Sequence, residues 1–261
     1  MQEVKKILSI AGSDSSGGAG IEADLKTIQA HDMFGMCAIT SVTAQNTTGV
    51  TGVCDMTPEF VKLQIDAVFT DIFPDAVKIG MVSSKEIIQA IAQKLREYKP
   101  KFIVADPVMV ATSGSLLLKE GSIDCLKNEL IPIADVITPN IPEAEVLSGI
   151  KINSSEDMIS AARIIGEITS AAILIKGGHL TDSADDLLYA DGKCTWMKAK
   201  RINNNNTHGT GCTLSSAIAC ELAAGNDIVT AVKNAKDYVY RAIGKGLNLG
   251  KGDGPLWHNI H

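Results

Sequence analysis

This chain has few aromatic residues and no excess of positive charge. Phe, Trp and Tyr make up only 4% of the 261 residues, so the core must be built from Ile, Val, Leu, Ala and Met. The 24 Lys and Arg residues are outnumbered by 30 Asp and Glu residues, which gives a net charge of −6. A broad nucleic-acid surface needs the opposite balance, so we expect no nucleic-acid partner. An anionic substrate would need a local positive site.

The cysteines and the apolar runs lack the spacing of zinc sites, signal peptides and membrane spans. No Cys pair or Cys/His cluster has zinc-ligand spacing; the six cysteines are Cys37, Cys54, Cys125, Cys194, Cys212 and Cys220. No run approaches the roughly 18 apolar residues of a membrane span. The segment Met1–Lys6 is short and charged, with no apolar signal region behind it. We therefore expect no membrane partner and a reducing, cytoplasmic location.

Familiar nucleotide-binding motifs are missing or weak. No Walker-type phosphate loop with its terminal Gly-Lys-Ser or Gly-Lys-Thr occurs. Gly18–Ala23 matches a GxGxxA dinucleotide fingerprint, but it begins well past the end of the first apolar run. That fingerprint also needs an acidic residue about 20 positions later, and none lies between Phe34 and Cys54. A nicotinamide or flavin role is therefore disfavoured.

Hydrophobic periodicity predicts strands that alternate with helices. The predicted strands are Ile7–Ala11, Met36–Ala44, Ala76–Ile79, Phe102–Ala105, Val136–Thr138 and Ala172–Ile175, followed by a hairpin of Asp186–Ala190 and Cys194–Arg201. The predicted helices are Ile21–Ala30, Pro58–Asp71, Ser84–Tyr98, Leu117–Ile131, Pro142–Leu147, Glu156–Ile168, Thr213–Ala224 and Ile228–Gly244. This alternation predicts an α/β fold, with a central, mostly parallel sheet flanked by helices and a small β-hairpin. Without a linker or repeat, we expect residues 1–261 to form a single domain.

Polar motifs directly follow several of the predicted strands. They are Gly12–Gly20, Gln45-Asn46-Thr47, Gly80-Met81, Asp106-Pro107, Pro139-Asn140 and Lys176-Gly177-Gly178. Ligands of such sheets bind beyond the carboxyl ends of the strands. We therefore expect these motifs to share one rim of the sheet and to form one site.

The stretch Asn206–Ser216 is the strongest single candidate for an anion site. It places Gly209 and Gly211 just before an apolar, helix-forming run. The first turn of a helix presents unpaired N–H groups and partial positive charge, which suit a phosphate or a developing negative charge. A cysteine at that place, Cys212, is expected to have a lowered pKa. The plainer interpretation is a glycine turn before a buried helix, with Cys212 as core filler.

Acidic residues near strand ends form a candidate magnesium site. Asp106 and Glu143, with Asn140, offer the oxygen ligands that Mg²⁺ prefers, directly or through water. Asn140 and Glu143 also suit a helix cap with glutamate at the third position, and both roles can hold together. Lys176 ends an apolar strand before two glycines, where it is either solvated or in reach of a phosphate. Together these groups are typical of phosphoryl transfer.

The motifs together resemble the hydroxymethylpyrimidine/phosphomethylpyrimidine kinases of thiamine biosynthesis, which belong to the ribokinase-like superfamily. The resemblance runs over nearly the whole chain, in the family's order. It rests on AGSDSSGGAGIEADLKT from Ala11, AQNT from Ala44, KIGM from Lys78, DPVM from Asp106, ATSG from Ala111, TPNIPEA from Thr138, KGGH from Lys176, NTHGTGCTLSSAIA from Asn206 and GPL from Gly254. It implies a ribokinase-like three-layer fold, ATP and Mg²⁺ as cofactors, and a homodimer.

The resemblance also implies a reaction and a role for each matched residue. The expected reaction phosphorylates a hydroxymethylpyrimidine and then its monophosphate. Cys212 matches the catalytic base, where sugar kinases carry aspartate, and the anion hole matches Gly209, Thr210 and Gly211. Gln45 matches the side chain that hydrogen-bonds the pyrimidine; the other substrate positions match Gly12, Asp24, Thr43, Met81 and Val108. Asp106 and Glu143 match metal positions, and Lys176 and Asn140 match ATP contacts. Thr43 stands where some members have valine.

Other functions remain open at this point. The nearest is a pyridoxal kinase or a kinase with both activities, since some relatives phosphorylate pyridoxal and carry a second cysteine in the lid. Ala111 follows Val110 here, which favours the pyrimidine. A sugar or nucleoside kinase is disfavoured because Cys212 replaces the expected aspartate. A catalytically silent sensor is disfavoured because every expected polar position is filled.

Overall fold

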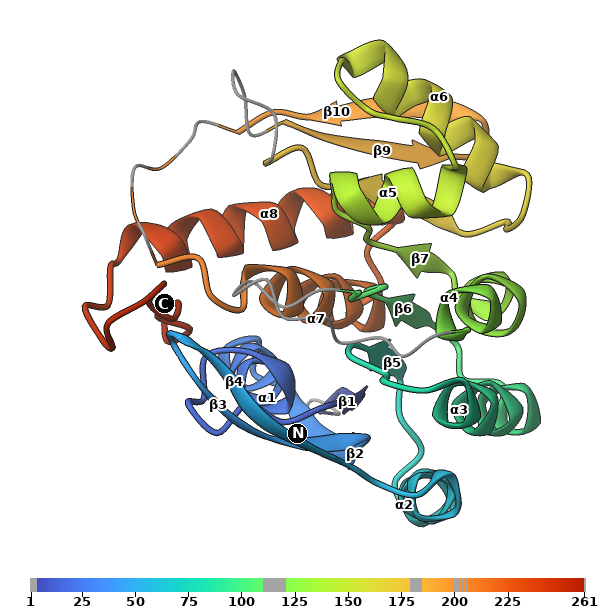
Figure 1. Ribbon diagram of the computed structural model, residues 1–261, viewed down its shortest axis with the longest axis vertical. Helices are drawn as coiled ribbons and strands as arrows, with labels where there is room; N and C mark the ends of the chain where they lie inside the picture. Colours follow the sequence, from blue (N-terminus) through green and yellow to red (C-terminus); the bar gives the residue numbers. More distant parts are fainter. Residues whose placement is uncertain are drawn as a thin grey trace.

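A computed structural model describes residues 4–109, 121–178, 185–199, 202, 204 and 206–260. Its main sheet has the strand order β10-β9-β8-β7-β6-β5-β1-β2 (Figure 1). The strands are β1 (Lys6–Ala11), β2 (Phe34–Ile39), β5 (Ala76–Ile79), β6 (Ile103–Ala105), β7 (Val136–Ile137), β8 (Ala172–Ile175), β9 (Asp186–Ala190) and β10 (Lys193–Met197). From β2 to β8 all neighbouring strands are parallel, and β9 is antiparallel to both of its neighbours. The predicted mostly parallel sheet is confirmed, and the predicted hairpin of β9 and β10 forms one edge of it.

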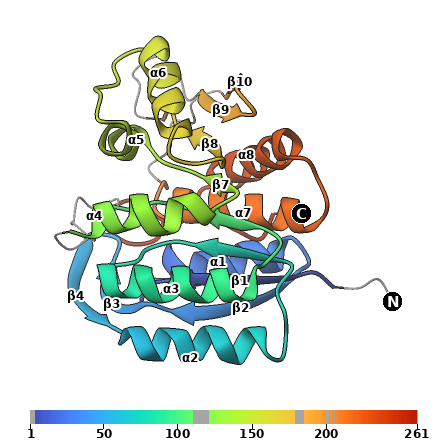
Figure 2. The same cartoon turned by 90° about the vertical axis from the view of Figure 1, so that its right-hand side faces the viewer.

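Helices cover both faces of this sheet. They are α1 (Gly20–Ala30), α2 (Pro58–Phe69), α3 (Lys85–Tyr98), α4 (Ser122–Cys125), α5 (Ile141–Ser148), α6 (Ser155–Gly166), α7 (Thr210–Ala223) and α8 (Ile228–Gly244). Figures 1 and 2 show α2 and α3 on one face, and α1, α7 and α8 on the other. Side chains alternate along a strand, so Leu8 of β1 packs in the core under α2 and α3, whereas Ile7 packs under α7 and α8. This three-layer arrangement is the one expected from the sequence.

Most of these helices begin with a side chain that accepts a backbone N–H bond. Thr57, Ser84, Asn140, Ser154 and Asp227 cap α2, α3, α5, α6 and α8 in this way. Helices α1 and α7 have Ala19 and Gly209 at the N-cap position, and neither has a side-chain cap. The Ile21 N–H of α1 donates to the Gly12 carbonyl, and the Thr210 N–H of α7 donates to the Thr207 carbonyl. Among the hydrogen bonds of the described residues, none uses the N–H groups of Gly211 and Cys212, so those two are available to other partners.

A second, two-stranded antiparallel sheet was not predicted. The expected strand Met36–Ala44 is two strands, because the chain leaves the main sheet at Thr40 and continues as β3 (Ser41–Asn46). The partner strand, β4 (Gly49–Asp55), was missed, since its glycines and exposed residues resemble a loop. Hydrophobic pattern alone does not reveal this change of sheet, because Thr40 and Ser41 are β-compatible residues between two partly apolar strands.

Other boundaries differ in detail. The expected helix Leu117–Ile131 is a short α4, a π-helical turn at Leu126–Leu130 and a 3₁₀ turn at Ile131–Ile133. Pro132 lacks the N–H that a regular helix would need. Residues 117–120 and the end of the predicted strand at Arg201 lie outside the described residues. The periodicity of the segment Pro58–Asp71 predicts Phe60 on the inner side of the helix, but in the structure Phe60 is 52% exposed. Among the described residues, no helix is long and apolar enough to cross a bilayer.

Candidate active site

A cavity of about 690 Å³ lies at the carboxyl ends of the parallel strands. The loops after β1, β5, β6, β7 and β8 line it, together with the N-terminal ends of α1 and α7. Most of the predicted site residues line it: Gly12, Gln45, Met81, Asp106, Val108, Asn140, Glu143, Lys176, Gly209, Thr210, Gly211 and Cys212. The predicted shared rim therefore exists, because parallel strands bring their carboxyl ends to one side.

The N-terminus of α7 forms one wall of the cavity. Gly209 precedes the helix with φ +85°, a conformation that L side chains rarely adopt. A Cβ atom at Gly209 would collide with the backbone carbonyl of Gly18, so the loop after β1 and the start of α7 fit together only through glycine. A Cβ at Gly211 would lie 3.2 Å from Asp106 Oδ2 and 3.4 Å from Lys176 Nζ. Gly211 therefore lets these two charged groups approach the first turn of the helix.

Asp106 and Lys176 form an ion pair in the cavity wall. The Lys176 Nζ atom lies 2.9 Å from Asp106 Oδ1, and the Thr138 hydroxyl donates to the same oxygen at 3.0 Å. Burial alone would lower the pKa of Lys176, but the charges of Asp106 and Glu143 raise it. Lys176 is therefore a charged lysine that faces the cavity, as expected for a phosphate contact.

Asn140 and Glu143 form a capping box at the start of α5. The Glu143 N–H donates to Asn140 Oδ1 at 2.9 Å, and the Asn140 N–H donates to Glu143 Oε2 at 2.8 Å. Burial raises the pKa of Glu143 to about 7, with a further rise from Asp106 and an opposing effect from Lys176. The helix-cap interpretation is thus confirmed, and the same carboxylate still faces the cavity.

Asp24, predicted to contact substrate, is not among the residues that line the cavity. It is 0% exposed and binds the Nζ atom of Lys78, which is also 0% exposed, at 2.9 and 2.7 Å through its two oxygens. The hydroxyls of Ser9 and Ser216 donate to the same carboxylate. The side chain of Asp24 is therefore committed to a buried ion pair beneath the cavity.

The Cys212 thiol differs from the expectation drawn from its helix position. Burial raises the pKa of Cys212 to about 11; the charges of Asp24 and Asp106 add to the rise, and Lys78 opposes it. The sequence-based expectation of a lowered pKa is wrong for this structure. The reason is tertiary, because desolvation of the sulfur and the charges of Asp24 and Asp106 outweigh the lowering by Lys78 and by the Gly20 N–H.

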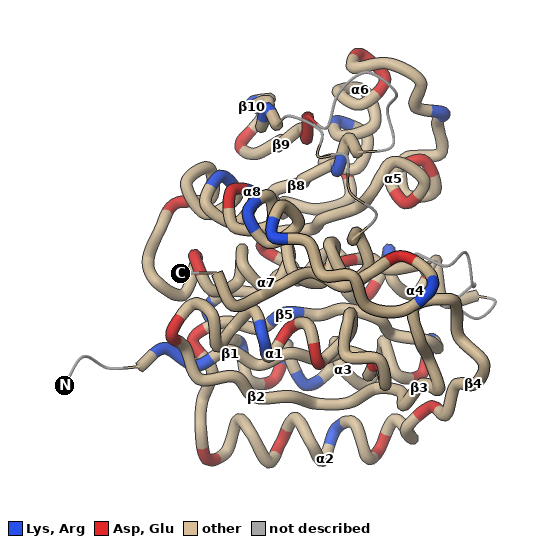
Figure 3. The backbone as a smooth tube through the Cα atoms, turned by 90° about the vertical axis from the view of Figure 1, so that its left-hand side faces the viewer, with Lys and Arg blue, Asp and Glu red and all other residues tan. Residues whose placement is uncertain are grey.

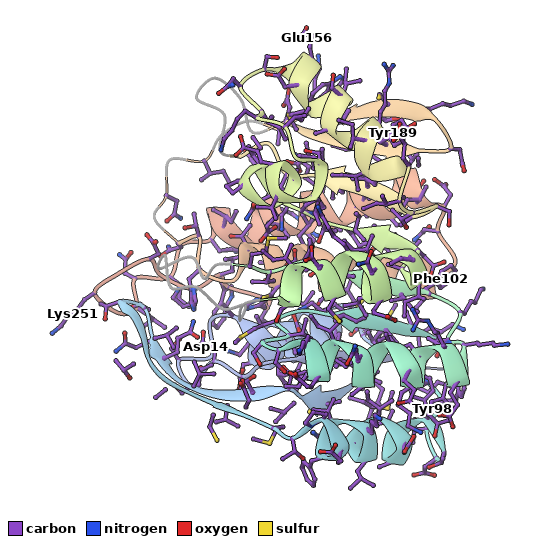
Figure 4. All side chains as sticks on the ribbon, turned by 45° about the vertical axis from the view of Figure 1, so that its right-hand side comes forward. Asp14, Tyr98, Phe102, Glu156, Tyr189 and Lys251 are labelled. Atoms are coloured by element: carbon purple, nitrogen blue, oxygen red, sulfur yellow. The ribbon has the colours of Figure 1, made fainter. Side chains whose placement is uncertain are left out.

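Asp14 organises the loop after β1 and was not singled out in the sequence. Its carboxylate accepts hydrogen bonds from the N–H groups of Ser16, Gly18 and Ala19 and lies 2.7 Å from His208 Nε2. Burial would raise the pKa of Asp14, but the bonds to His208 and Ser16 lower it to about 2. Figure 4 labels Asp14 beside the loop that precedes α7. Asp14 and His208 thus fasten the loop after β1 to the loop before α7.

Gln45 lies at a bulge of β3, and Thr43 holds it in place. The ladder between β3 and β4 shifts register between Ala44 and Gln45. The Thr43 hydroxyl donates to the Ser13 carbonyl at 2.8 Å and lies 3.3 Å from Gln45 Oε1. Thr43 is buried and does not line the cavity, whereas Gln45 does. The amide of Gln45 can both donate to and accept from a neutral heterocycle.

Three residues at or beneath the cavity were not predicted individually from the sequence: Lys78, Asp14 and His208. A weak signal for Lys78 was present, since a lysine inside the buried apolar strand Ala76–Ile79 is unusual. Asp14 and His208 are 194 positions apart, so only the fold reveals that they pair. The arrangement brings helix N–H groups, Lys176, the carboxylates of Asp106 and Glu143 and the Cys212 thiol to one cavity, with Lys78 buried beneath it, which suits transfer of a phosphoryl group.

The fold and this cavity define a ribokinase-like kinase. The phosphomethylpyrimidine kinase family model matches residues 14–257. The chain belongs to that family.

Similar proteins carry related names. The hydroxymethylpyrimidine/phosphomethylpyrimidine kinase of Haemophilus influenzae is 44% identical over 263 residues, which cover 99% of this chain and 98% of that protein. The thiamine biosynthesis bifunctional protein ThiED of Geobacter sulfurreducens is 47% identical over 253 residues, which cover 97% of this chain but 52% of that protein. This chain therefore spans about half the length of the bifunctional relative.

Solved structures agree with the family. The crystal structure of phosphomethylpyrimidine kinase from Clostridium difficile is 49% identical, with a TM-score of 0.83 over 92% of this chain and 99% of that chain. The pyridoxal kinase of Staphylococcus aureus in complex with AMP-PCP and pyridoxal is 35% identical, with a TM-score of 0.90 over 98% of this chain and 94% of that chain.

Proposed function

We propose that this enzyme transfers the γ-phosphoryl group of ATP to 4-amino-5-hydroxymethyl-2-methylpyrimidine and then to the resulting monophosphate. The observation that carries the proposal is the uncapped N-terminus of α7, which presents free N–H groups beside Cys212 and Lys176 in one cavity. Such a helix end stabilises the negative charge that develops on the transferring oxygens. The names of the similar proteins support the pyrimidine as acceptor.

The pyrimidine end of the cavity is formed by Gln45, Gly12, Met81 and Val108. Met81 and Val108 supply apolar surface for a flat ring, and Gln45 supplies paired hydrogen-bond groups. A Cβ atom at Gly12 would lie 3.0 Å from the Met81 sulfur, so glycine leaves room for Met81 beside the ring. No formal charge is needed at this end, which fits a neutral aminopyrimidine.

The phosphate end is formed by Lys176, Asn140 and the first turn of α7. Lys176 is charged and reaches the cavity. The use of ATP is supported by the AMP-PCP complex of the structurally similar pyridoxal kinase. We infer that Lys176 binds a nucleotide phosphate and that Gly209 and Gly211 present their N–H groups to the group in transfer. The third predicted anion-hole residue, Thr210, donates its N–H to the Thr207 carbonyl at 3.2 Å.

Mg²⁺ fits the residues present, with Asp106 and Glu143 as its carboxylates. The described residues contain no cluster of three or more His, Cys, Asp or Glu side chains, so a fully protein-bound metal is not supported there. Mg²⁺ commonly uses one or two carboxylates together with waters and substrate phosphates. Asp106 Oδ2 has no other partner among the hydrogen bonds of the described residues, which leaves it for an ion. Bound Mg²⁺ would neutralise phosphate charge.

Cys212 is the group that we propose accepts the proton of the substrate hydroxyl. An alcohol attacks a phosphoryl group well only when its proton has an acceptor. Only the thiolate can accept it, and the resting thiol of Cys212 holds its proton because its pKa is raised. Positive charge near the sulfur therefore decides how much of the active form is present.

A pyridoxal kinase activity is the second candidate. The pyridoxal kinase structures superpose on this chain with TM-scores of 0.89 to 0.91, above the 0.83 of the Clostridium difficile enzyme. The position after Val110, where some relatives carry a second cysteine, lies outside the described residues. The cavity walls described here suit either ring, so the acceptor must be measured.

The test is ATP consumption with four acceptors in parallel: hydroxymethylpyrimidine, its monophosphate, pyridoxal and ribose. We expect turnover with the first two and none with ribose. Comparable kcat/KM for pyridoxal would establish the dual activity instead. Turnover with ribose alone, or with no acceptor, would overturn the proposal.

We also propose that the protein forms a homodimer through the sheet of β3 and β4. An isolated two-stranded sheet is marginally stable in water. Val42 and Val53 of this sheet are 46% and 49% exposed, and Cys54 is exposed. Its tip is held by Thr47, which accepts hydrogen bonds from the N–H groups of Lys251 and Gly252; Figure 4 shows Lys251 at that tip. Val42 and Cys54 pair across the ladder and share one face of the sheet, and a second copy would cover that face.

A further inference from the structure

The buried ion pair of Lys78 and Asp24 lies just beneath the cavity, and the proposed reaction does not yet use it. Lys78 lies in β5. A Cβ atom at Gly80, the first residue after that strand, would lie 2.6 Å from the Lys78 Nζ atom. The absence of a side chain at Gly80 therefore leaves the space that the Lys78 ammonium occupies. Because Met81 already lines the cavity, the ammonium lies at the same end of β5 as the site.

Stability alone does not account for this pair. Moving two charges out of water costs several kcal/mol per ion, and replacing such a pair with apolar side chains of similar volume is often neutral or stabilising. The other residues of β5 are Ala76, Val77 and Ile79, all buried, so an apolar residue at position 78 would suit the strand. The charge itself is therefore the feature that needs an explanation.

The pair is tied to the helix that carries Cys212. Ser216 donates its hydroxyl to Asp24 Oδ1 at 2.9 Å. Ser216 follows Cys212 by four residues in α7, so the two side chains share one face, about 6 Å apart along the axis. Asp24 thus holds the Lys78 ammonium one turn below the thiol, against the inner side of the helix.

Charged groups face the Cys212 sulfur from several elements. They are Lys78 on β5, Asp24 on α1 and Asp106 after β6. Lys176, after β8, is also close enough for the charge of Cys212 to raise its pKa. Burial has the largest effect and raises the pKa of Cys212; the lowering by Lys78 exceeds the rise from Asp24 or from Asp106. Burial would lower the pKa of Lys78, but Asp24, Cys212 and Asp106 raise it to about 12, so the ammonium keeps its proton.

We propose that Lys78 is a positioning residue of this site, whose buried ammonium, anchored by Asp24, is the counter-charge of the Cys212 thiolate. The inference rests on the proposed function only for the use of that thiolate as a base. The counter-charge acts in the free enzyme, without any substrate. Asp24 serves as the anchor that keeps the ammonium beneath α7.

The experiment measures how fast iodoacetamide alkylates Cys212 between pH 7 and pH 10. In a background with Cys37, Cys54, Cys125 and Cys194 replaced by serine, the remaining cysteines are Cys212 and the fully buried Cys220. Mass spectrometry follows labelling at Cys212. Three forms are compared: the background itself, Asp24→Asn, and the double variant Asp24→Asn with Lys78→Gln. The two amides of the double variant can still bond to each other and to Ser9 and Ser216.

The double variant should slow alkylation, and Asp24→Asn shows whether the ammonium stays charged without its anchor. Asp24→Asn removes a negative charge near the sulfur and speeds alkylation where Lys78 keeps its proton. It also removes the largest effect that keeps this proton on the buried ammonium, and loss of the proton slows alkylation as in the double variant. The double variant also removes the larger effect of Lys78, so the pKa of Cys212 should rise. Alkylation should then be slower than in the background, by about tenfold for each unit by which that pKa rises. A purely structural role would change the alkylation rate by the same factor at every pH, without moving the pH at which the rate rises. If Asp24→Asn does not fold, the double variant is still compared directly with the background, and an equal rate across the pH range would overturn the proposal.

Failure of this inference can be told apart from failure of the proposed function. The alkylation uses no substrate, so a slowed double variant supports the counter-charge even if hydroxymethylpyrimidine is not phosphorylated. If hydroxymethylpyrimidine is phosphorylated but alkylation is unchanged, the counter-charge alone is wrong. In the active enzyme, the double variant should also shift the rise of kcat to higher pH while the KM for ATP stays the same.

Discussion

Two opposing effects meet at the sulfur of Cys212. The N-terminus of a helix favours a negative charge by about 0.3–1 kcal/mol, and by about 2 kcal/mol in favourable cases. Burying a charge costs several kcal/mol. Burial therefore wins, and it raises the pKa of Cys212 to about 11. The thiolate is a minor species in the resting site, and ligands or Lys78 must favour it.

Replacing Cys212 with serine tests the base. Cys212→Ser keeps the size but supplies a far weaker base, so kcat should fall by about 10²–10⁴-fold. Binding of AMP-PCP should persist, because the N–H groups of α7 are unchanged. Steady-state kinetics and calorimetry measure the two effects. Turnover at the wild-type rate would show that Cys212 only packs, and Asp24 could not replace it because its carboxylate is committed to Lys78.

The stability of the folded protein should depend on pH through Glu143. Burial raises its pKa from 4.5 to about 7, so the folded state holds a proton there that the unfolded state has lost. The unfolding free energy should therefore fall as pH rises from 4.5 to about 7, by roughly 3 kcal/mol. Urea unfolding without Mg²⁺ measures it, and Glu143→Gln should remove this part of the slope. The same slope in both proteins would contradict the assignment.

Helix ends distinguish the site from the rest of the fold. Helices α2, α3, α5, α6 and α8 satisfy their first N–H groups with side chains, whereas α1 and α7 do not. The ends of α1 and α7 lie at the cavity, where Ala19, Gly20 and Gly209 line it; the four-residue α4 also lacks a side-chain cap but lies elsewhere. The stabilisation that a cap would add, about 1 kcal/mol each, is absent where a ligand has to bind.

A side chain at Gly209 should disturb this element. Gly209→Ala places a Cβ in a left-handed conformation and against the Gly18 carbonyl, so the unfolding free energy should fall by at least about 2 kcal/mol. AMP-PCP binding should weaken as well. Gly52→Ala is the matched control, since its nearest contact would be 3.7 Å and ordinary. Equal stability of both variants in urea unfolding would show that the loop relaxes freely.

At the scale of the whole molecule, the site depends on both layers of helices. Helices α1 and α7 come from one face of the sheet, and the capping box of α5 comes from the other (Figure 1). Figure 3 shows acidic and basic positions interspersed along the chain. The positive charge at the site is therefore local and comes from Lys176 and the buried Lys78.

The proposed dimer is tested by mass. Light scattering after size exclusion should give about twice the 27.6 kDa of one chain. Val42→Glu places a charge on the exposed side of the small sheet and should shift the mass to one chain. Phe73→Glu, at a residue that is 47% exposed outside that sheet, is the control and should stay dimeric. A single-chain mass for the unmodified protein would contradict the dimer.

Local pattern predicted most of the elements, because burial on one face leaves a periodic trace in the sequence. Ala76–Ile79, Ala172–Ile175, Asp186–Ala190 and Ile228–Gly244 have their predicted bounds. The break at Thr40 left no such trace, since both β2 and β3 are partly apolar. Strand-end motifs also predicted the rim, because the direction of parallel strands follows from their alternation with helices.

The sequence by itself thus determined the layers, the shared rim and the glycine turn before α7, all of which follow from local spacing. Only the tertiary structure decided the charge state of the site. It paired Asp24 with Lys78 across 54 positions and Asp14 with His208 across 194, and it desolvated the Cys212 sulfur near the charges of Lys78, Asp24 and Asp106. These are long-range contacts in a medium of low dielectric, where the neighbours of a charge decide its energy more than its own place in a helix does.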